Sequence, residues 1–265
     1  MATTGSKPHT KSARAMAQEE RRKARERFHL AEKLEAEYLR ALRKVVKQVD
    51  HIVKEMAPGG SIKNSQEMQN ILRGYAKLIE PWATSVANRM LKRIASKDED
   101  AWAKLGKDMG ISLRKEINEA PTGQVFRAFL QEQVRLITSL PTEAAERVHK
   151  LTMEGMIQGG RRASEIQKDI LETGNVTMSR ARLIARTEVA RTASALTMAR
   201  AMHVGSTHYV WRTSGDADVR KSHKEMNGAV VPWDTMPTLS DGTKCHAGMI
   251  YNCRCYPEPI LSNLE

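Results

Sequence analysis

Aromatic residues and cysteines are scarce in this sequence, and long apolar runs are missing. Phe, Trp and Tyr make up 5% of its 265 residues, so few rings are available on which the bases of single-stranded nucleic acid could stack. Because no run of about 18 apolar residues occurs, the sequence predicts no membrane-spanning helix. The first residues also lack the apolar segment of a secretory signal, and we expect folding in a reducing cytoplasm.

Familiar enzyme signatures are missing as well. The sequence contains no phosphate-binding loop, dinucleotide fingerprint or paired-carboxylate pattern. His223-Lys224-Glu225 has the H-x-E form of zinc deaminases, but the companion P-C-x-x-C is absent. A Cys–His nucleophile would need an orienting partner and an oxyanion hole, and no motif marks either. The sequence therefore predicts a protein that is not an enzyme.

Positive charge is abundant, and it is concentrated in two zones. The formal net charge is +12, and residues 1–57 (14 Lys/Arg, 8 Asp/Glu) and 161–224 (12 Lys/Arg, 6 Asp/Glu) each contribute +6. Such zones are either solvated helix faces or contacts with a polyanion. For the second alternative we expect sequence-independent contacts with the phosphates of double-stranded DNA. The side chains predicted to make these contacts are Arg21, Arg22, Lys23, Arg180, Arg182 and Arg200.

Apolar periodicity predicts a mainly α-helical N-terminal region with long helices, followed by a small α+β C-terminal domain. A helix is expected to begin at Pro141, where an acidic first turn follows the proline. After about residue 204, β-branched and aromatic residues and an Asn227-Gly228 turn predict short strands. The expected segments are a disordered 1–11, a long basic helix over 12–57, a helical region over 58–120, and a domain over 121–265.

An apolar seam runs along the second half of the first long helix. Its residues recur at alternating spacings of four and three, which is the pattern of a helix that packs against another helix. The partner is either a helix of another protein or copy, or a later helix of the same chain. The seam consists of Tyr38, Leu42, Val45, Val49, Ile52 and Met56.

Four short sequence elements follow one another over residues 179–259: "ARLIARTEVART", "YVWRTSGDADVRKSH", "NG" and "NCRC". In these elements the sequence resembles the C-terminal domain of the Mu F-like minor head proteins of tailed phages, with fainter similarity back to about residue 125. The resemblance implies a minor capsid or head-morphogenesis protein located in the virion, in the capsid interior or at the portal vertex. It also implies association with the portal and other head proteins and a role in DNA packaging or ejection, while self-association is an alternative that the apolar seam raises.

Charged residues within these elements have three interpretations. On a regular helix Glu188 cannot face Arg186, two positions away, but it can pair with Arg191, three positions on. An ion-pair network that fastens this helix to the small sheet is the first interpretation, contact with nucleic acid is the second, and a catalytic role is the third. Asp216 or Asp218 is expected to cap a short helix, and Trp211 is expected in the core. The motif residues given structural roles are Arg186, Glu188, Arg191, Trp211, Asp216, Arg220 and Gly228.

All three cysteines lie within eleven positions, at Cys245, Cys253 and Cys255. In an extended segment Cys253 and Cys255 would project to the same face and could bind one ion. Zinc favours four nitrogen and sulfur ligands, so we expect His223, Cys245, Cys253 and Cys255, with His246 as a substitute for one of them. Buried free thiols that pack a small core are the alternative. A disulfide between Cys253 and Cys255 is disfavoured because it would close a very small ring.

Two functions of different classes follow. The first is a structural head protein that holds DNA through its basic zones. The second is a zinc-dependent nuclease, or another enzyme delivered with the genome, that would use His223 with Asp216.

Overall fold

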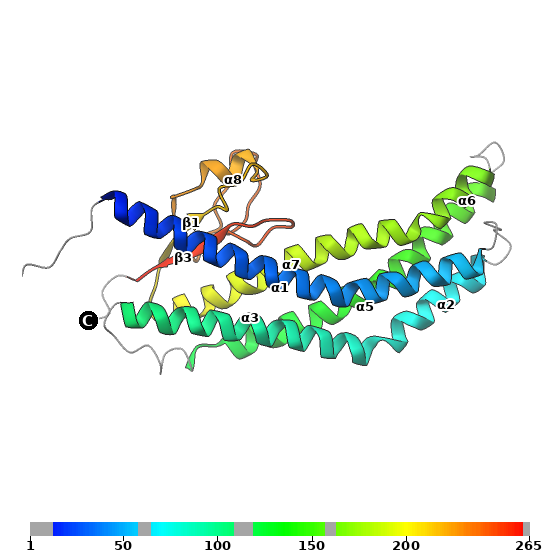
Figure 1. Cartoon of the computed structure of the whole chain (residues 1–265), viewed down its shortest axis with the longest axis horizontal. Helices are drawn as coiled ribbons and strands as arrows, with labels where there is room; N and C mark the ends of the chain where they lie inside the picture. Colours follow the sequence, from blue (N-terminus) through cyan, green and yellow to red (C-terminus); the bar gives the residue numbers. More distant parts are fainter. Residues whose placement is uncertain (1–12, 58–64, 109–118, 157–162, 262–265) are drawn as a thin grey trace, which may run out of the picture.

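The computed structural model describes residues 13–57, 65–108, 119–156 and 163–261. The disorder expected for residues 1–11 lies outside this part of the chain. Long helices form an elongated bundle, and a small three-stranded sheet sits at one end of it (Figure 1). The helices are α1 (Ala13–Met56), α2 (Ser65–Leu78), α3 (Glu80–Asp108), α5 (Thr122–Met156), α6 (Ala163–Leu171), α7 (Thr173–His203) and α8 (Lys221–Glu225), and the strands are β1 (His208–Arg212), β2 (Val230–Pro232) and β3 (Tyr256–Ile260).

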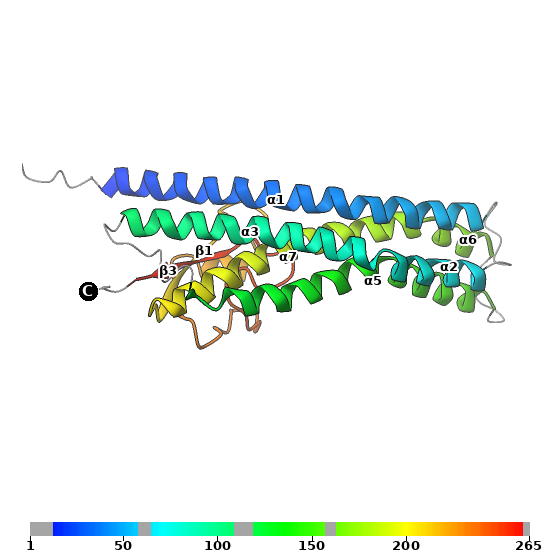
Figure 2. The same ribbon diagram turned by 90° about the horizontal axis from the view of Figure 1, so that it is seen from below.

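Helices α1, α3, α5 and α7 lie side by side along the bundle, and α2 and α6 extend it at the far end (Figure 2). Pro81 sits in the first turn of α3, where its missing N–H would have no partner inside the helix. The bundle core contains apolar side chains from α1, α2, α3, α5, α6 and α7. The predicted fold class, long helices followed by a small α+β unit, is confirmed. None of the described helices is both long and apolar enough to cross a membrane.

The apolar seam of α1 is buried inside this bundle. Tyr38, Leu42, Val45 and Val49 are at most 3% exposed, and Ile52 is 8% exposed. Met56 is partly buried against the same core. The helices that pack on α1 include α5 and α7 of the same chain. The prediction that the seam binds a partner helix is therefore corrected: its apolar surface is already covered within the chain.

Pro141 does not begin a helix, because α5 runs through it from Thr122 to Met156. A proline inside a helix removes one backbone hydrogen bond. In α5 the hydroxyls of Thr138, Ser139 and Thr142 donate to backbone carbonyls of the preceding turn, at 3.0, 3.0 and 3.1 Å. These side chains supply extra hydrogen bonds around the proline, and burial of the flanking apolar residues keeps the helix continuous.

A buried ion pair joins α3 to α7. Arg200 Nε donates to Asp98 Oδ2 at 2.6 Å, and both side chains are 6% exposed. Thr197 Oγ1 donates to the other carboxylate oxygen of Asp98 at 2.8 Å. Arg200 was predicted to contact DNA, and this prediction is wrong because its charge is enclosed between two helices. A charge on an internal helix has to be paired, and Asp98 provides the partner.

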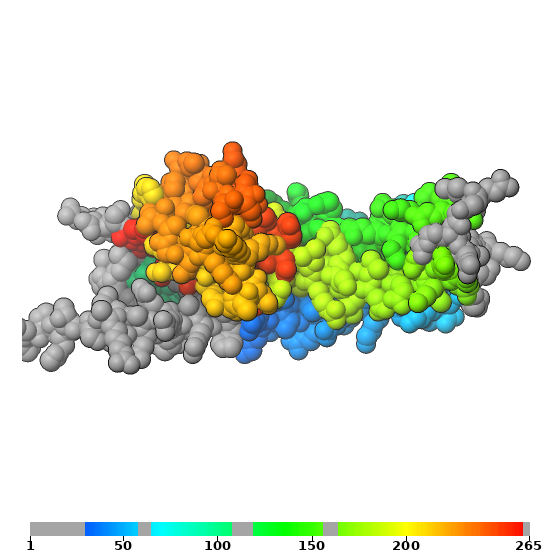
Figure 3. All heavy atoms as spheres, turned by 90° about the horizontal axis from the view of Figure 1, so that it is seen from above, coloured from blue at the N-terminus to red at the C-terminus, as the bar shows by residue number. Residues whose placement is uncertain are grey.

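The C-terminal sheet has the strand order β2-β1-β3, with both neighbours antiparallel to β1. On β1, Tyr209 and Trp211 are fully buried, which confirms the core position predicted for Trp211. Their cluster includes Trp102 from α3 and Ala201 from α7. The C-terminal unit therefore shares its core with the bundle, and in the space-filling view it forms a protrusion over one end of the molecule (Figure 3).

Removing one member of the buried pair should be costly. We expect Asp98→Ala to lower the free energy of unfolding by about 3–5 kcal/mol, because the buried Arg200 loses its main counter-charge. The double variant Asp98→Leu/Arg200→Met should recover most of this loss. Urea unfolding followed by circular dichroism measures both. The control is Lys97→Ala, which breaks the exposed Lys97–Asp100 pair and should change stability by less than about 1 kcal/mol. Equal losses for Asp98→Ala and Lys97→Ala would contradict the role given to the buried pair.

Candidate functional site

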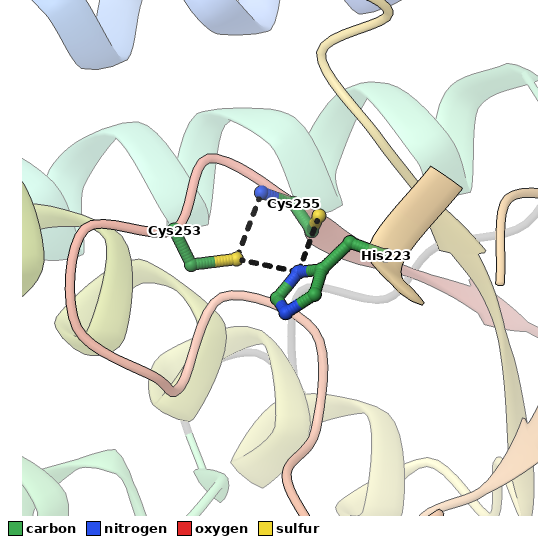
Figure 4. A group of neighbouring side chains, drawn as sticks. All are labelled: His223, Cys253 and Cys255. Carbon is green, nitrogen blue, oxygen red and sulfur yellow. Dashed lines mark hydrogen bonds between the residues drawn. The ribbon is translucent and has the colours of Figure 1, made fainter. Parts of the chain in front are cut away.

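Three of the four predicted metal ligands meet in the C-terminal unit. His223 comes from α8, while Cys253 and Cys255 come from the loop that precedes β3. His223 Nδ1 lies 3.4 Å from Cys255 Sγ and 3.5 Å from Cys253 Sγ. All three residues are buried, and their ligand atoms lie within 4.8 Å of one another. Figure 4 shows the three side chains pointing toward a common centre.

The cysteine loop is held in place by α7. Asn252 has a positive φ of 55°, the only such value among the described residues other than glycine. Arg186 Nη1 donates to Asn252 Oδ1 at 2.8 Å, and the backbone N–H of Asn252 donates to Thr187 Oγ1 at 3.0 Å. The "ART" element of α7 thus fixes the turn that precedes Cys253. Cys253 and Cys255 lie in this loop and not in an extended strand, which corrects the expectation for that segment.

A glycine allows the loop to pack this closely. Gly248 has a φ of 78°, and a Cβ atom built there would lie 2.2 Å from Ser194 Oγ and 2.8 Å from the carbonyl oxygen of Cys255. Any other residue would therefore be strained in its backbone and would also push the loop away from α7.

Helix α8 is short, and side chains around it fix its position. Ser222 Oγ donates to Asp241 Oδ2 at 2.8 Å. Arg220 Nη2 donates to the carbonyl oxygen of Tyr251 at 3.1 Å, and its guanidinium lies 4.9 Å from the centre of the Tyr251 ring. The ring of Trp211 meets the ring of His223 edge-on, with 5.5 Å between centroids. These contacts orient His223 toward the cysteine loop.

The two aspartates before α8 do not cap it. The N-cap residue is Arg220, which makes no side-chain capping bond. Instead Asp216 Oδ1 accepts the backbone N–H of Asp218 at 3.1 Å, which closes a local turn. Arg254 Nη2 then pairs with Asp216 at 3.2 Å and with Asp218 at 3.3 Å. The capping prediction is wrong, and the carboxylates bind the arginine between the two cysteines.

The Asn227-Gly228 turn forms where it was predicted. Gly228 has a φ of 89°, and its backbone N–H donates to the carbonyl oxygen of Trp211 at 2.8 Å. Asn227 Oδ1 accepts the backbone N–H of Thr213 at 3.0 Å. The turn therefore returns the chain from α8 to β2 beside β1.

Cys245 and His246 do not join the His223 group. Cys245 is a buried member of the apolar cluster around Trp211, and burial raises its thiol pKa to about 11. His246 Nδ1 lies 3.1 Å from the hydroxyl of Tyr209, and burial lowers the pKa of the imidazole. The predicted four-ligand set is therefore corrected to three residues. The path of the loop, which spacing alone does not give, separates Cys245 from the others.

The two grouped cysteines have different proton affinities. A hydrogen bond from Cys255, followed by one from His223, lowers the pKa of Cys253 to about 4. The same contact with Cys253, followed by burial, raises the pKa of Cys255. Their mutual contact therefore favours the thiolate form at Cys253 and the thiol form at Cys255.

A polar pocket of about 280 Å³ opens beside this group. His223, Cys253 and Cys255 form one part of its lining. The rest of the lining is largely charged, and it includes Arg186, Arg220, Arg254, Asp216 and Asp218. Residues from the "ARLIARTEVART", "YVWRTSGDADVRKSH" and "NCRC" elements therefore line the same pocket.

A chain of buried polar groups crosses the bundle next to this unit. Tyr38 donates its hydroxyl to Gln133 Oε1 at 2.9 Å, and Gln133 Nε2 donates to Glu188 Oε2 at 2.7 Å. Arg191 Nη1 donates to Glu188 Oε1 at 2.9 Å, in the pairing that helical spacing predicted. Burial, with a smaller contribution from the charge of Glu188, raises the pKa of Tyr38. Tyr38 therefore stays protonated as the donor that links α1 to α5 and α7.

The three predicted DNA-binding residues whose side chains the structure describes do not form one surface. Arg200 is buried, Arg180 pairs with Glu143 at 3.1 Å, and Arg182 is exposed on α7. The side chains of Arg21, Arg22 and Lys23 lie outside those that the structure describes.

The structure reveals a different basic surface on α1, opposite the buried seam. Arg40, Arg43, Lys44 and Lys47 are all exposed and follow helical spacing, so they share one face. We call these four residues the α1 basic stripe. His51 and Lys54 continue the same face, but Lys54 pairs with Asp50 at 2.7 Å. The sequence carried this signal: basic residues recur between the seam positions with the same period.

The turn at Asn252 can be tested with two substitutions. Asn252→Gly keeps the positive φ and removes the bond to Arg186, so we expect a loss of about 0.5–1.5 kcal/mol in unfolding free energy. Asn252→Ala removes the same bond and also strains the backbone, which should cost about 1 kcal/mol more. Urea unfolding of both variants measures the difference. An alanine variant as stable as the glycine variant would show that the left-handed conformation at this position carries no strain.

Residues 146–257 match the family described as "Phage Mu protein F like protein". The chain is also 28% identical over 212 residues to an uncharacterized protein of Haemophilus influenzae. That alignment covers 79% of this chain and 46% of the relative, so the chain spans about half the length of the curated relative it matches. No solved structure matches the chain. The region from the second half of α5 to the start of β3, which contains α7, β1, β2 and the cysteine loop described above, therefore matches the Mu protein F-like family.

Proposed function

We propose that the chain is a structural protein of phage heads, located in the virion, that supports head assembly. The match of residues 146–257 to the Mu protein F-like family carries this proposal. The roles of the motif residues are consistent with it. Arg186, Thr187 and Asn252 fasten the cysteine loop to α7, and Arg254 fastens it to the segment before α8. These contacts serve the architecture of the domain.

The finer part of the proposal is that the protein associates with the portal and contacts packaged DNA without reading its sequence. The α1 basic stripe supports the DNA contact. Its four cations lie on one exposed helix face, and the face extends over roughly 10 Å because an α-helix rises 1.5 Å per residue. Flexible positive side chains of this kind bind phosphates without contacting base edges. The net charge of +12 supports the same inference.

A zinc-dependent nuclease is the second candidate. One observation favours it: Asp216 lines the same pocket as His223, Cys253 and Cys255. However, Arg254 pairs with Asp216 at 3.2 Å, and a general base would have to be released from that pair. Incubation of supercoiled plasmid with the zinc-loaded protein distinguishes the two functions, because only the second leads to nicked DNA.

DNA binding should be electrostatic and localised to α1. If the stripe contacts about four phosphates, affinity for double-stranded DNA should fall roughly a hundredfold between 50 and 200 mM salt. Changing Arg40, Arg43, Lys44 and Lys47 to Gln should remove most of this binding. The matched control changes Arg127, Lys150, Lys168 and Lys244 to Gln, which are exposed but spread over the molecule. Fluorescence anisotropy at several salt concentrations measures each. Equal weakening by the two sets would mean that net charge, and not the stripe, determines binding.

Particle composition tests the location. Mass spectrometry of purified heads should detect this chain, and a portal complex isolated from them should retain it. The Asn252→Ala variant should be incorporated less efficiently, because the loop that joins the C-terminal unit to α7 is weakened. Heads that lack the chain altogether would refute the structural role, whereas heads that contain it after removal of the portal would refute only the portal association.

A further inference from the structure

The geometry points to a zinc site formed by His223, Cys253 and Cys255, whose fourth ligand is solvent from the adjoining polar pocket. This proposal is independent of the proposed function in phage heads. Its ligands come from two segments thirty residues apart in sequence, α8 and the cysteine loop, and all three are buried. The inference rests on four observations: the spacing of the ligand atoms, their chemistry, their surroundings and the position of the pocket.

The spacing of the three side chains fits a tetrahedral ion. With Zn–S near 2.3 Å and Zn–N near 2.0–2.1 Å, a tetrahedral angle separates a sulfur and a nitrogen ligand by about 3.5 Å. His223 Nδ1 lies 3.4 Å from one sulfur atom and 3.5 Å from the other. Both edges of the coordination polyhedron that include the imidazole are thus already close to the required length. These two distances would therefore need little change on zinc binding.

The chemistry of the ligands favours zinc over other divalent ions. Two thiolates and a neutral imidazole form a soft ligand set, which binds zinc and does not suit Mg²⁺ or Ca²⁺. Two thiolates also balance the charge of the ion, and this matters because all three residues are at most 4% exposed. Zinc binding would release the remaining thiol protons to solvent, and no oxidant or reductant is needed.

Cys253 and Cys255 belong to the same apolar cluster as Cys245, but they also have polar surroundings that Cys245 lacks. Cys253 and Cys255 border a pocket lined by arginines and aspartates, whereas Cys245 does not line it. N–H donors also point at the sulfurs. The backbone N–H of Cys255 donates to Cys253 Sγ at 3.3 Å. The buried indole N–H of Trp211 has no regular hydrogen bond among the described residues, and it interacts with the sulfur of Cys255. Sulfur atoms that bind a metal commonly accept hydrogen bonds from N–H groups of this kind.

The pocket determines the fourth position. Neither Cys245 nor His246 belongs to the group whose ligand atoms lie together, and His246 is occupied by Tyr209. The pocket of about 280 Å³ that touches all three ligands can hold water. A zinc ion with three protein ligands and one water has an exchangeable coordination position. Three arginines outnumber the two aspartates in the lining, which would favour an anion at that position.

The experiment uses the full chain, because the C-terminal unit shares its core with α3. Protein purified under reducing conditions without added zinc should contain one zinc per chain by elemental analysis. Cobalt substitution should give thiolate charge-transfer absorption and visible bands of tetrahedral intensity, and azide should shift those bands by replacing solvent. Cys253→Ser and Cys255→Ser should lose the metal, while Cys245→Ser, the matched control, should retain it.

Thiol labelling gives a readout that does not depend on folding of the variants. In the zinc-loaded wild-type chain, Cys253 and Cys255 should react slowly with a thiol reagent, and removal of zinc by a chelator should speed their labelling. Absence of bound zinc together with a failure to take up cobalt would overturn the site. Loss of zinc from Cys245→Ser, or cobalt bands that azide leaves unchanged, would overturn the three-ligand assignment in favour of a closed site.

Discussion

Helix α7 is buried on several faces, and this constraint determines much of the rest of the structure. Its buried residues include Gly174, Ala181, Thr187, Glu188 and Arg200, which do not lie on one stripe. Helices α1, α3 and α5 pack around it, and β3 also contacts it. Small residues make such packing possible. At Gly174 a Cβ atom would lie only 2.3 Å from the carboxylate of Asp50 on α1.

Polar side chains on the buried faces of such a helix cannot reach solvent, so most of them have partners inside the protein. Glu188 has Gln133 and Arg191, Arg200 has Asp98, and Thr187 has the backbone of Asn252. The partners belong to α5, α3, α7 itself and the cysteine loop. Buried polar groups on one helix therefore specify how the other elements dock against it. The candidate metal site is one result of this arrangement, because Arg186 and Thr187 place Asn252, and Asn252 places Cys253.

Sequence patterns predicted where helices and strands form better than they predicted which residues are buried and what those residues contact. The period of the α1 seam correctly indicated burial against helices, but periodicity carries no information about which chain supplies them. Arg200 looks like Arg182 in sequence, and only the packing of α3 shows that one is enclosed and the other exposed. Pro141 is a strong helix-start signal that burial on both sides overrode. Three of the four residues predicted as metal ligands lie together, because chemistry identifies cysteine and histidine as candidates whereas the path of a loop decides which of them meet.

The shared core gives the candidate zinc site an influence beyond the small unit that contains it. Trp102 of α3 and Ala201 of α7 lie in the same cluster as Trp211, Cys253 and Cys255. Any ligand that binds only the folded state stabilises everything that folds together with its site. Because no assembled site exists in the unfolded chain, zinc at His223, Cys253 and Cys255 would stabilise the packing of α3 and α7 as well as the loop. The α1 basic stripe lies on the outer face of the same bundle, so the metal would also help to hold the helix that carries the proposed DNA contact.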